Sequence, residues 1–442
     1  MDNTLAYIDQ ASFLGFRALG RGPLIQLTWI YDHEVDLEAL RRFQHALGGG
    51  MLGRRIERSP LPFGRHRWVT WEPPADLDVR SGTWPRSELP DWVQQRLAMP
   101  LDAEFGPPWH LGVLRLDGGG AAVCLTVSHT VGDGVGIAIA VTAAVQGITD
   151  PPGYPPPHTR RRGRALVEDA RQIIAGLPEA ARGLVSAIRV ARDKSGEVRD
   201  SVRKNAPASV SGSDSAVAVP WATLYVSAAD WDERASSLGG TSNSLFLGVA
   251  ARLGALFGRV RADGSVELAV PVNERTPGDV SGNALTGVTV ITDPAPVTTD
   301  LRGVRQGFKS ALSTLSEARH ELAAPLPLTP LIPRGVARRL AGVALGSAAV
   351  IGCSNIGTLD PAVNRPDGTD AEYFSMRAME SRISAGEIAR QGGLLFLVCT
   401  RVHGQVSVTV SFSDPAVSTT RDELVETLRG ALADFRLSGS VW

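Results

Sequence analysis

Cysteine is scarce in this sequence, and its placement excludes two classes of small domain. The 442 residues include three cysteines, Cys124, Cys353 and Cys399, which lie far apart and have apolar neighbours. An odd number at such separations fits neither a disulfide framework nor a cysteine-ligated zinc site. We therefore expect a protein of the reducing cytosol that holds no metal.

The sequence also lacks an excess of one charge and a long apolar run. Lys and Arg total 45 and Asp and Glu total 46, which leaves a formal charge of −1 and no global field to attract nucleic acid. The longest nearly apolar run, Leu340 to Gly352, is interrupted by Ser347 and is shorter than the roughly 20 residues that span a bilayer. The N-terminus has no signal-peptide pattern. We expect a cytoplasmic protein whose membrane contact is at most peripheral.

The composition that remains is globular and falls into two halves. Hydrophobic residues make up 43% of the chain, and its length suggests two to three domains. A cluster of prolines and arginines between Pro151 and Arg164 ends the first globular pattern. We divide the chain into an N-terminal half of residues 1–150, a linker of residues 151–215 and a C-terminal half of residues 216–442.

The linker itself has a helical pattern with a basic character. Apolar residues recur at helical spacing on both sides of Pro178, and because proline interrupts a helix interior, two amphipathic helices are predicted. Arginines and lysines outnumber acidic residues in this stretch. Such a pair could lie on anionic lipid or cover another domain, and we favour the second. Residues 206–219 are small and polar, as in a flexible connector.

Hydrophobic periodicity predicts helices and strands in both halves, so the expected fold class is α/β of the α+β type. The predicted helices cover residues 36–47, 88–97, 135–145, 242–256 and 420–435, and the predicted strands cover residues 121–127, 265–272, 394–400 and 405–412. The last two strands form a hairpin, and alternation in the second of them indicates one buried face. Thr419 or Thr420 is suited to cap the final helix.

One segment carries a recognisable chemical pattern. In CLTVSHTVGDGVG, Cys124 to Gly136, an apolar strand runs into His129, a glycine turn with Asp133 and Gly134 follows, and then a helix. A histidine held at a strand end beside a tight turn is well placed to accept a proton from an alcohol or amine near neutral pH. A structural histidine bonded within the turn explains this segment equally well. The seven other histidines lack metal-ligand spacing, and we expect them on the surface or in loops.

Other segments decide between these interpretations. They are IDQASFLGF (8–16), LDAEFGPPWHLGVL (101–114), GGTSNSLFLGVAARL (239–253), VPVNERTPGDVSGN (270–283) and CSNIG (353–357). With the histidine motif, they resemble in order the CoA-dependent acyltransferase superfamily, whose mark is His-His-x-x-x-Asp-Gly. The likeness is greatest to bacterial wax ester synthase/diacylglycerol acyltransferase proteins, and the condensation domains of peptide synthetases are relatives.

The resemblance implies a fold and a reaction. It implies two sandwich domains like chloramphenicol acetyltransferase, with a channel between them where an acyl-CoA or an acylated carrier protein meets a small-molecule alcohol or amine. His129 is implied as the general base, and no metal or redox cofactor is needed. Asp133 is implied to pair with Arg275 and, with Gly134, to support the motif. Asn243 or Ser354 could contact the oxyanion or substrate, although each is more often a cap or a strand-end hydrogen bonder.

The sequence departs from the family pattern at three positions, of which Ser244 and Pro108 bear on the acceptor. Ser128 replaces the first histidine of the pair, Ser244 replaces the aspartate of Asn-Asp, and Pro108 replaces the leucine of Pro-Leu-Trp. The leading hypothesis is an O-acyltransferase of lipid-like ester or secondary-metabolite biosynthesis. An amide-forming enzyme of the condensation type is one alternative, and a degenerate docking module without turnover is another. The acyl chain, the acceptor and the oligomeric state are left open.

Overall fold

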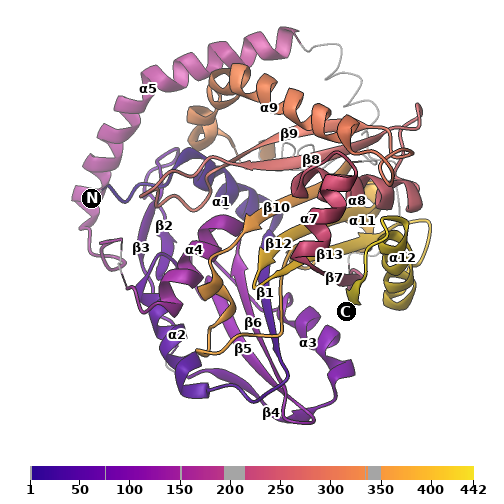
Figure 1. The fold of residues 1–442 in the computed structure, drawn as a ribbon. Coiled ribbons are helices and arrows are strands. Elements are labelled where there is room, and N and C mark those ends of the chain that lie inside the picture. Colours follow the sequence, from indigo (N-terminus) through magenta and orange to yellow (C-terminus); the bar gives the residue numbers. More distant parts are fainter. Residues whose placement is uncertain (1, 75, 150–151, 194–214, 334, 337–349) are drawn as a thin grey trace.

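Two β-sheets flanked by helices form the body of the protein (Figure 1). The structure, a computed structural model, describes residues 2–74, 76–149, 152–193, 215–333, 335–336 and 350–442. The predicted mixture of helices and strands is confirmed in both halves of the chain.

The first sheet has five strands in the order β11-β1-β6-β5-β4. Their bounds are Tyr373–Glu380, Pro23–Tyr31, Ala121–Ser128, Trp109–Leu116 and Asp78–Trp84. Strand β6 pairs antiparallel with β1 and β5 and is buried along its whole length, which explains why its sequence is a continuous apolar run. The two-stranded hairpin of β2 (Arg54–Glu57) and β3 (Arg67–Thr70) lies beside this sheet.

The second sheet has seven strands in the order β14-β7-β13-β12-β10-β8-β9. Their bounds are Gly439–Val441, Trp221–Ser227, Gln405–Ser413, Leu394–Val402, Val350–Thr358, Val266–Asn273 and Leu285–Thr292. The predicted hairpin of β12 and β13 is confirmed, with Leu394 opposite Ser413 and Val402 opposite Gln405.

Helices flank the sheets, and six of those in the described residues begin at an Asp, Ser or Thr whose side chain caps the first turn. Their bounds are Tyr7–Leu19 (α1), Leu37–Gly49 (α2), Leu89–Arg96 (α3), Gly134–Val145 (α4), Arg162–Asp193 (α5), Ala228–Ser237 (α7), Ser242–Leu256 (α8), Arg302–Ala323 (α9), Ala385–Arg390 (α11) and Arg421–Asp434 (α12). Short 3-10 turns cover Arg86–Glu88, Leu326–Leu331 (η2) and Pro361–Asn364. Of the two cap candidates for the last helix, Thr420 is the one used, in a capping box with Glu423.

The prediction of one buried face for β13 is wrong, because the structure buries both faces. Its polar residues Ser407, Thr409 and Ser411 are each no more than 3% exposed. The hydroxyl of Thr409 bonds to that of Thr223 in β7, and the hydroxyl of Ser407 bonds to that of Thr400 in β12. Ser411 Oγ accepts from Nε of the buried Arg377 in β11 at 3.3 Å. The polar face of the strand is therefore covered by the first sheet instead of by water.

The sheets do not follow the division of the chain into halves. Strand β11 belongs to residues 216–442 by sequence, yet it pairs with β1 at the edge of the first sheet, with Leu24 opposite Met379 and Trp29 opposite Phe374. The C-terminal half thus supplies one edge strand to the N-terminal sheet. This exchange brings β11 directly beside β12 and fixes the two sheets against each other.

The prediction of two linker helices is wrong, because α5 is one helix that passes through Pro178. Proline removes one backbone donor and disturbs the preceding turn, which costs about 3 kcal/mol in the interior of a helix. Pro178 is exposed on the outer side of the helix, where water can satisfy the freed carbonyl of the preceding turn. Most of the predicted connector, and the start of the apolar run from Leu340, lie outside the described residues. No helix of the described residues is long and apolar enough to cross a membrane.

Candidate active site

His129 lies at the end of β6, where the two sheets adjoin. Its backbone N–H donates to the Pro23 carbonyl of β1 at 3.0 Å, and the preceding Ser128 is 2% exposed with its own N–H bonded to Pro108. The backbone of His129 is therefore held by two neighbouring strands. Its ring is half-buried and faces the contact between the sheets.

Two hollows meet at this histidine. The smaller, of about 100 Å³, is lined by the motif turn, by Val272 and Leu285 of the second sheet, and by Ser354. The larger, of about 370 Å³, is lined mainly by apolar residues, among them Ile383 and Leu394. His129, Ala378 and Phe396 border both hollows. Groups bound in either hollow would therefore lie beside the same imidazole ring.

The imidazole of His129 is held by an asparagine from the other half of the chain. Asn283, in the loop between β8 and β9, places its Oδ1 2.9 Å from His129 Nδ1. Its Nδ2 donates to Asp9 Oδ1 at 3.0 Å, and its backbone N–H donates to the same oxygen at 2.7 Å. Asp9, on helix α1, is fully buried and also accepts from the N–H of Gly282. Three segments far apart in the chain thus converge behind the ring.

These contacts determine which ring nitrogen carries the proton. Because the carboxylate of Asp9 can only accept, the amide nitrogen of Asn283 must face Asp9 and its oxygen must face His129. An amide oxygen only accepts, so Nδ1 of His129 is the protonated nitrogen. The lone pair is then on Nε2, the nitrogen that this network leaves for a substrate.

Arg54 closes the network from behind. Its guanidinium is fully buried, donates to the carbonyls of Val131 and Val280, and lies 4.2 Å from the centre of the Trp68 ring. Burial raises the pKa of Asp9, and the charge of Arg54 and the hydrogen bonds from Asn283 oppose that rise. Burial also lowers the pKa of Arg54. The cation therefore ties the motif turn to the β8–β9 loop.

Asp133 has its carboxylate oxygens occupied away from the imidazole. It caps helix α4 by accepting from the N–H of Gly136 at 2.7 Å, and it accepts from the N–H of Ala284 at 2.8 Å. The Nη2 of Arg275 donates to it at 2.9 Å, with both side chains at most 5% exposed. Asp133 thus joins the motif turn of the first half to the β8–β9 loop of the second.

Arg275 also organises its own loop. Its guanidinium donates to the carbonyls of Asp279, Ser281 and Gly282 at 3.0 to 3.1 Å. These bonds curl residues 275–282 around the guanidinium and bring Asn283 to the imidazole. The ion pair is therefore part of the support of His129 and does not contact its ring.

Two glycines permit the close approach of the halves. A Cβ on Gly134 would lie 2.6 Å from the Cδ1 of Ile356 in β10, and a Cβ on Gly282 would lie 2.8 Å from Asp9 Oδ1. Real Cβ atoms do not come so close to other heavy atoms, so a side chain at either position would force the facing side chain of Ile356 or Asp9 to shift. Gly134 supports the site through this packing.

The two oxyanion candidates fall in different places. Ser354 lines the smaller hollow with His129. Asn243 is not among the residues that line either hollow, and its Oδ1 accepts from Asn355 Nδ2 at 2.7 Å. Asn355, which does line the smaller hollow, is the side chain through which Asn243 reaches the site. Ser244, in place of the family's aspartate, closes a capping box with Thr241 and so has a structural role.

Sequence reasoning assigned no role to Asp9, Asn283 or Arg54. Asp9 and Asn283 lie within two of the family-like segments, and an acidic residue on an otherwise apolar helix face was a usable signal. The expectation that the other histidines lie on the surface or in loops is wrong for His110, which lies within strand β5 with its side chain 16% exposed. His66 does lie in a loop, where its ring packs against Phe13. Within the described residues, no group of three or more His, Cys, Asp or Glu is arranged to hold a metal ion.

Comparison with known proteins bears on the family. Residues 37–223 match the family model of the wax ester synthase/diacylglycerol acyltransferase catalytic domain, so the resemblance inferred from the sequence is confirmed over that range. Two Mycobacterium tuberculosis proteins, both named "Putative diacyglycerol O-acyltransferase", are 31% identical over 156 residues. The match covers 31% of this chain and spans 33% of those relatives, about a third of their length.

Comparison with solved structures bears on the fold. The first condensation domain of the calcium-dependent antibiotic synthetase, solved with a substrate analogue, aligns with a TM-score of 0.59 at 17% identity, covering 99% of this chain and 100% of that one. The wax ester synthase/diacylglycerol acyltransferase of Marinobacter aquaeolei VT8 aligns with a TM-score of 0.55 at 15% identity, covering 98% of each chain. The predicted fold class is confirmed.

Proposed function

We propose that this protein is an acyltransferase of the wax ester synthase/diacylglycerol acyltransferase family, which moves an acyl group from a thioester to a hydroxyl acceptor. The observation that carries the proposal is the setting of His129. One imidazole borders two hollows and is held from behind by an asparagine and a buried carboxylate. A structural histidine needs neither the hollows nor a fixed tautomer.

The reaction uses the lone pair on His129 Nε2. The acceptor hydroxyl gives its proton to Nε2 as its oxygen attacks the thioester carbonyl, and the carbon–oxygen bond forms. The carbon–sulfur bond then breaks, and the leaving thiolate takes the proton back from the imidazolium. A positioned base of this kind contributes about 10²–10⁴ in rate, and holding both substrates in line contributes further. The scheme needs only the thioester and the acceptor.

The Asn283–Asp9 pair supports this role through the imidazolium. When Nε2 takes a proton, both ring nitrogens become donors, and the Nδ1–H bond to Asn283 persists. Asp9 behind the amide then compensates part of the new positive charge. Asn283 and Asp9 are positioning residues, since neither lines the hollows where substrates bind.

The lining of the two hollows suggests which part of the substrates each one binds. The larger hollow is lined by aliphatic side chains such as Ile383, Leu394 and Leu395, so we assign an apolar chain to it. The smaller hollow contains Ser354 and Asn355, polar groups that can donate to the oxygen of the thioester carbonyl. The donor is an acyl-CoA or an acylated carrier protein, and the acceptor is a small alcohol.

The test measures free-thiol release. The purified chain is mixed with acyl-CoAs of increasing length, together with a panel of alcohols and amines. We expect alcohol-dependent thiol release that His129→Ala lowers at least 10²-fold, with unchanged circular dichroism. The matched control is His403→Ala, an exposed histidine on the β12–β13 turn, which should retain turnover. Near-normal turnover of His129→Ala would refute general-base catalysis by this residue.

The same panel separates the alternative functions. Thiol release that depends on amines and not on alcohols would identify an amide-forming enzyme of the condensation type. Absence of release with every CoA donor, followed by release with the same acyl group on a carrier protein, would identify the donor class. No release from either donor would leave docking of a partner protein as the better account.

A further inference from the structure

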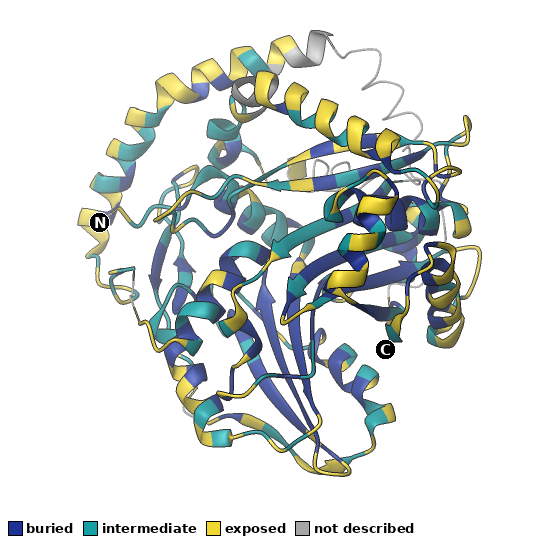
Figure 2. Cartoon of the chain, in the orientation of Figure 1, coloured by how far each residue is buried: buried dark blue, intermediate teal, exposed yellow. Residues whose placement is uncertain are grey.

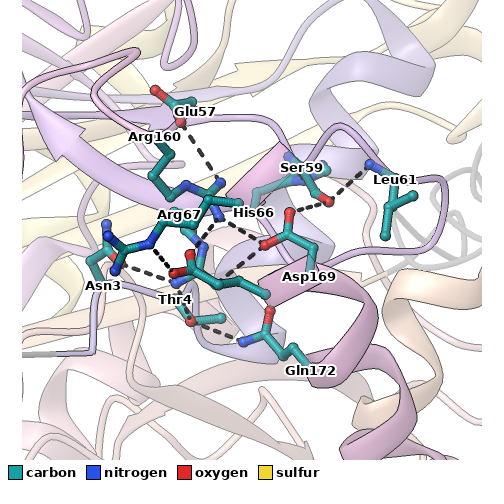
Figure 3. Close-up of polar contacts among 12 residues, drawn as sticks. Asn3, Thr4, Glu57, Ser59, Leu61, His66, Arg67, Arg160, Asp169 and Gln172 are labelled. Atoms are coloured by element: carbon teal, nitrogen blue, oxygen red, sulfur yellow. Dashed lines mark hydrogen bonds and ion pairs between the residues drawn. The ribbon is translucent and has the colours of Figure 1, made fainter. Parts of the chain in front are cut away.

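Helix α5 is fixed to the body of the protein along one face. Asp169, which is fully buried, accepts from Ser59 Oγ at 2.6 Å and pairs with Arg160 at 2.8 Å and Arg67 at 3.3 Å (Figure 3). Three residues on, Gln172 donates to Thr4 at 3.0 Å. These contacts hold α5 against the β2–β3 hairpin and the N-terminal segment, so the helix cannot rotate about its axis without breaking them.

A second face of the same helix is apolar and open. Its members are Leu166, Val167, Ile174, Leu177, Leu184, Val185 and Ile188, between 42% and 66% exposed. At 3.6 residues per turn they fall within one arc of about 100°. This outer stripe runs along most of a helix of 32 residues, roughly 48 Å long, on the outside of the molecule (Figure 2).

Four arginines border the outer stripe on one side. Arg164, Arg171, Arg182 and Arg189 are exposed and fall within an arc of about 20° next to the apolar residues. The acidic residues of known placement on the helix lie on the other side of these arginines, away from the apolar stripe and toward the body of the protein. Of these, Glu168 pairs with Arg164 and Arg160, and Glu179 accepts from the Tyr7 hydroxyl at 3.2 Å. The open surface therefore presents aliphatic side chains with positive charge beside them.

We propose that the outer stripe of α5, together with these four arginines, docks the protein on an anionic lipid surface. Aliphatic side chains enter the region between headgroups and acyl chains, and the arginines meet lipid phosphates. A long, narrow aliphatic stripe bordered by one sign of charge matches a flat anionic surface. A lipid surface rather than another domain is therefore the partner whose chemistry complements this face.

The test uses vesicle flotation with the full chain. Vesicles of phosphatidylcholine with 30 mol% phosphatidylglycerol are compared with pure phosphatidylcholine vesicles. We expect retention on the anionic vesicles that falls as salt is raised from 0.1 M to 0.5 M, because added salt screens the arginines. The charge variant Arg171→Gln/Arg182→Gln should lower partitioning about 25-fold, at roughly fivefold per charge. Glutamine keeps the helix propensity of arginine.

The apolar variant is Ile174→Ala/Leu184→Ala/Val185→Ala, in which alanine preserves the helix. It should lower partitioning at least tenfold on the same vesicles. The matched control is Leu256→Ala/Val417→Ala, which removes exposed aliphatic side chains outside α5 and should bind as the unaltered chain does. Thiol release with short, soluble substrates should be unchanged in all of these variants, which separates this proposal from that of the acyltransferase reaction.

Three results would overturn the proposal. The first is equal binding to neutral and anionic vesicles, because it would remove the role of the arginines. The second is loss of binding in the Leu256/Val417 control to the same extent as in the α5 variants. The third is absence of binding to either vesicle together with a dimer in light scattering that the apolar variant dissociates, which would make the stripe a face between copies of the chain.

Discussion

The ion pair between Asp133 and Arg275 can be tested by a double-mutant cycle. Both side chains are almost completely buried, and the Nη2 to Oδ2 distance is 2.9 Å. Removing one member of a buried pair leaves the other charge uncompensated, which costs about 3–5 kcal/mol. We expect Arg275→Ala to lower the free energy of unfolding by that amount, because Asp133 keeps only the N–H groups of Gly136 and Ala284.

Asp133→Ala should cost more than Arg275→Ala. It leaves the guanidinium unpaired and also removes the N-cap of α4, which adds about 1 kcal/mol. Asp133→Asn keeps an oxygen that can cap the helix while it removes the charge, so its loss should be smaller than that of Asp133→Ala. In the double alanine variant no buried charge is left behind. The double variant should therefore lose less stability than the two single variants together.

The assay is urea unfolding followed by circular dichroism, with thiol release measured on the same preparations. The matched control is the cycle on Arg252 and Asp434, a pair at 2.8 Å whose side chains are about a third exposed. Its coupling energy should be below about 1 kcal/mol. Simple additivity of Asp133→Ala and Arg275→Ala would refute the ion-pair account. Full stability of Asp133→Asn with activity reduced by orders of magnitude would instead assign Asp133 a direct role in orienting His129.

Three further predictions concern the support of His129, acid stability and chain length. Asn283→Ala should lower kcat about 10²-fold through misplacement of the imidazole, and loss of the Nδ1–H acceptor should move the acid limb of the pH–rate profile to lower pH; an unmoved profile would contradict the positioning role. Burial and the charge of Arg58 lower the pKa of His66 to about 4, so the unfolded chain binds more protons below about pH 6.5. The free energy of unfolding should therefore fall by roughly 3 kcal/mol as the pH drops from 6.5 to 4. In His66→Gln the midpoint of urea unfolding should not show this dependence on pH. Ile383→Trp should shorten the preferred apolar chain in thiol-release assays, and an unchanged preference would place the chain elsewhere.

Local sequence patterns predict most of the secondary structure. The helix at Ser242–Leu256 was predicted with the observed bounds, because its cap residue and its apolar period agree with each other. The strand before His129 was also recognised, since a central strand covered on both sides needs a continuous apolar run. In each case the sequence signal and the structural requirement lie within the same few residues.

The errors arose where distant segments decide the outcome. The polar residues of β13 indicated a solvent-exposed face, yet that face is buried because β11 and its Arg377 cover it. Pro178 indicated a break, yet α5 continues because contacts such as those of Asp169 hold the surrounding turns in place. No pattern within either segment reports what packs on it from elsewhere in the chain.

The site shows the same division between local and distant information. The strand, turn and helix around His129 can be predicted from one segment of the sequence. The groups that set the tautomer of His129 come from α1 and from the β8–β9 loop. Their sequence separation from the histidine, 154 residues for Asn283, leaves no spacing rule to apply. Because Asp9 belongs to the first half and Asn283 to the second, the imidazole is correctly held only when both halves are assembled. An N-terminal half by itself would keep the whole histidine motif and still lack the acceptor for Nδ1, so the reactive tautomer is a property of the assembled chain and not of the motif.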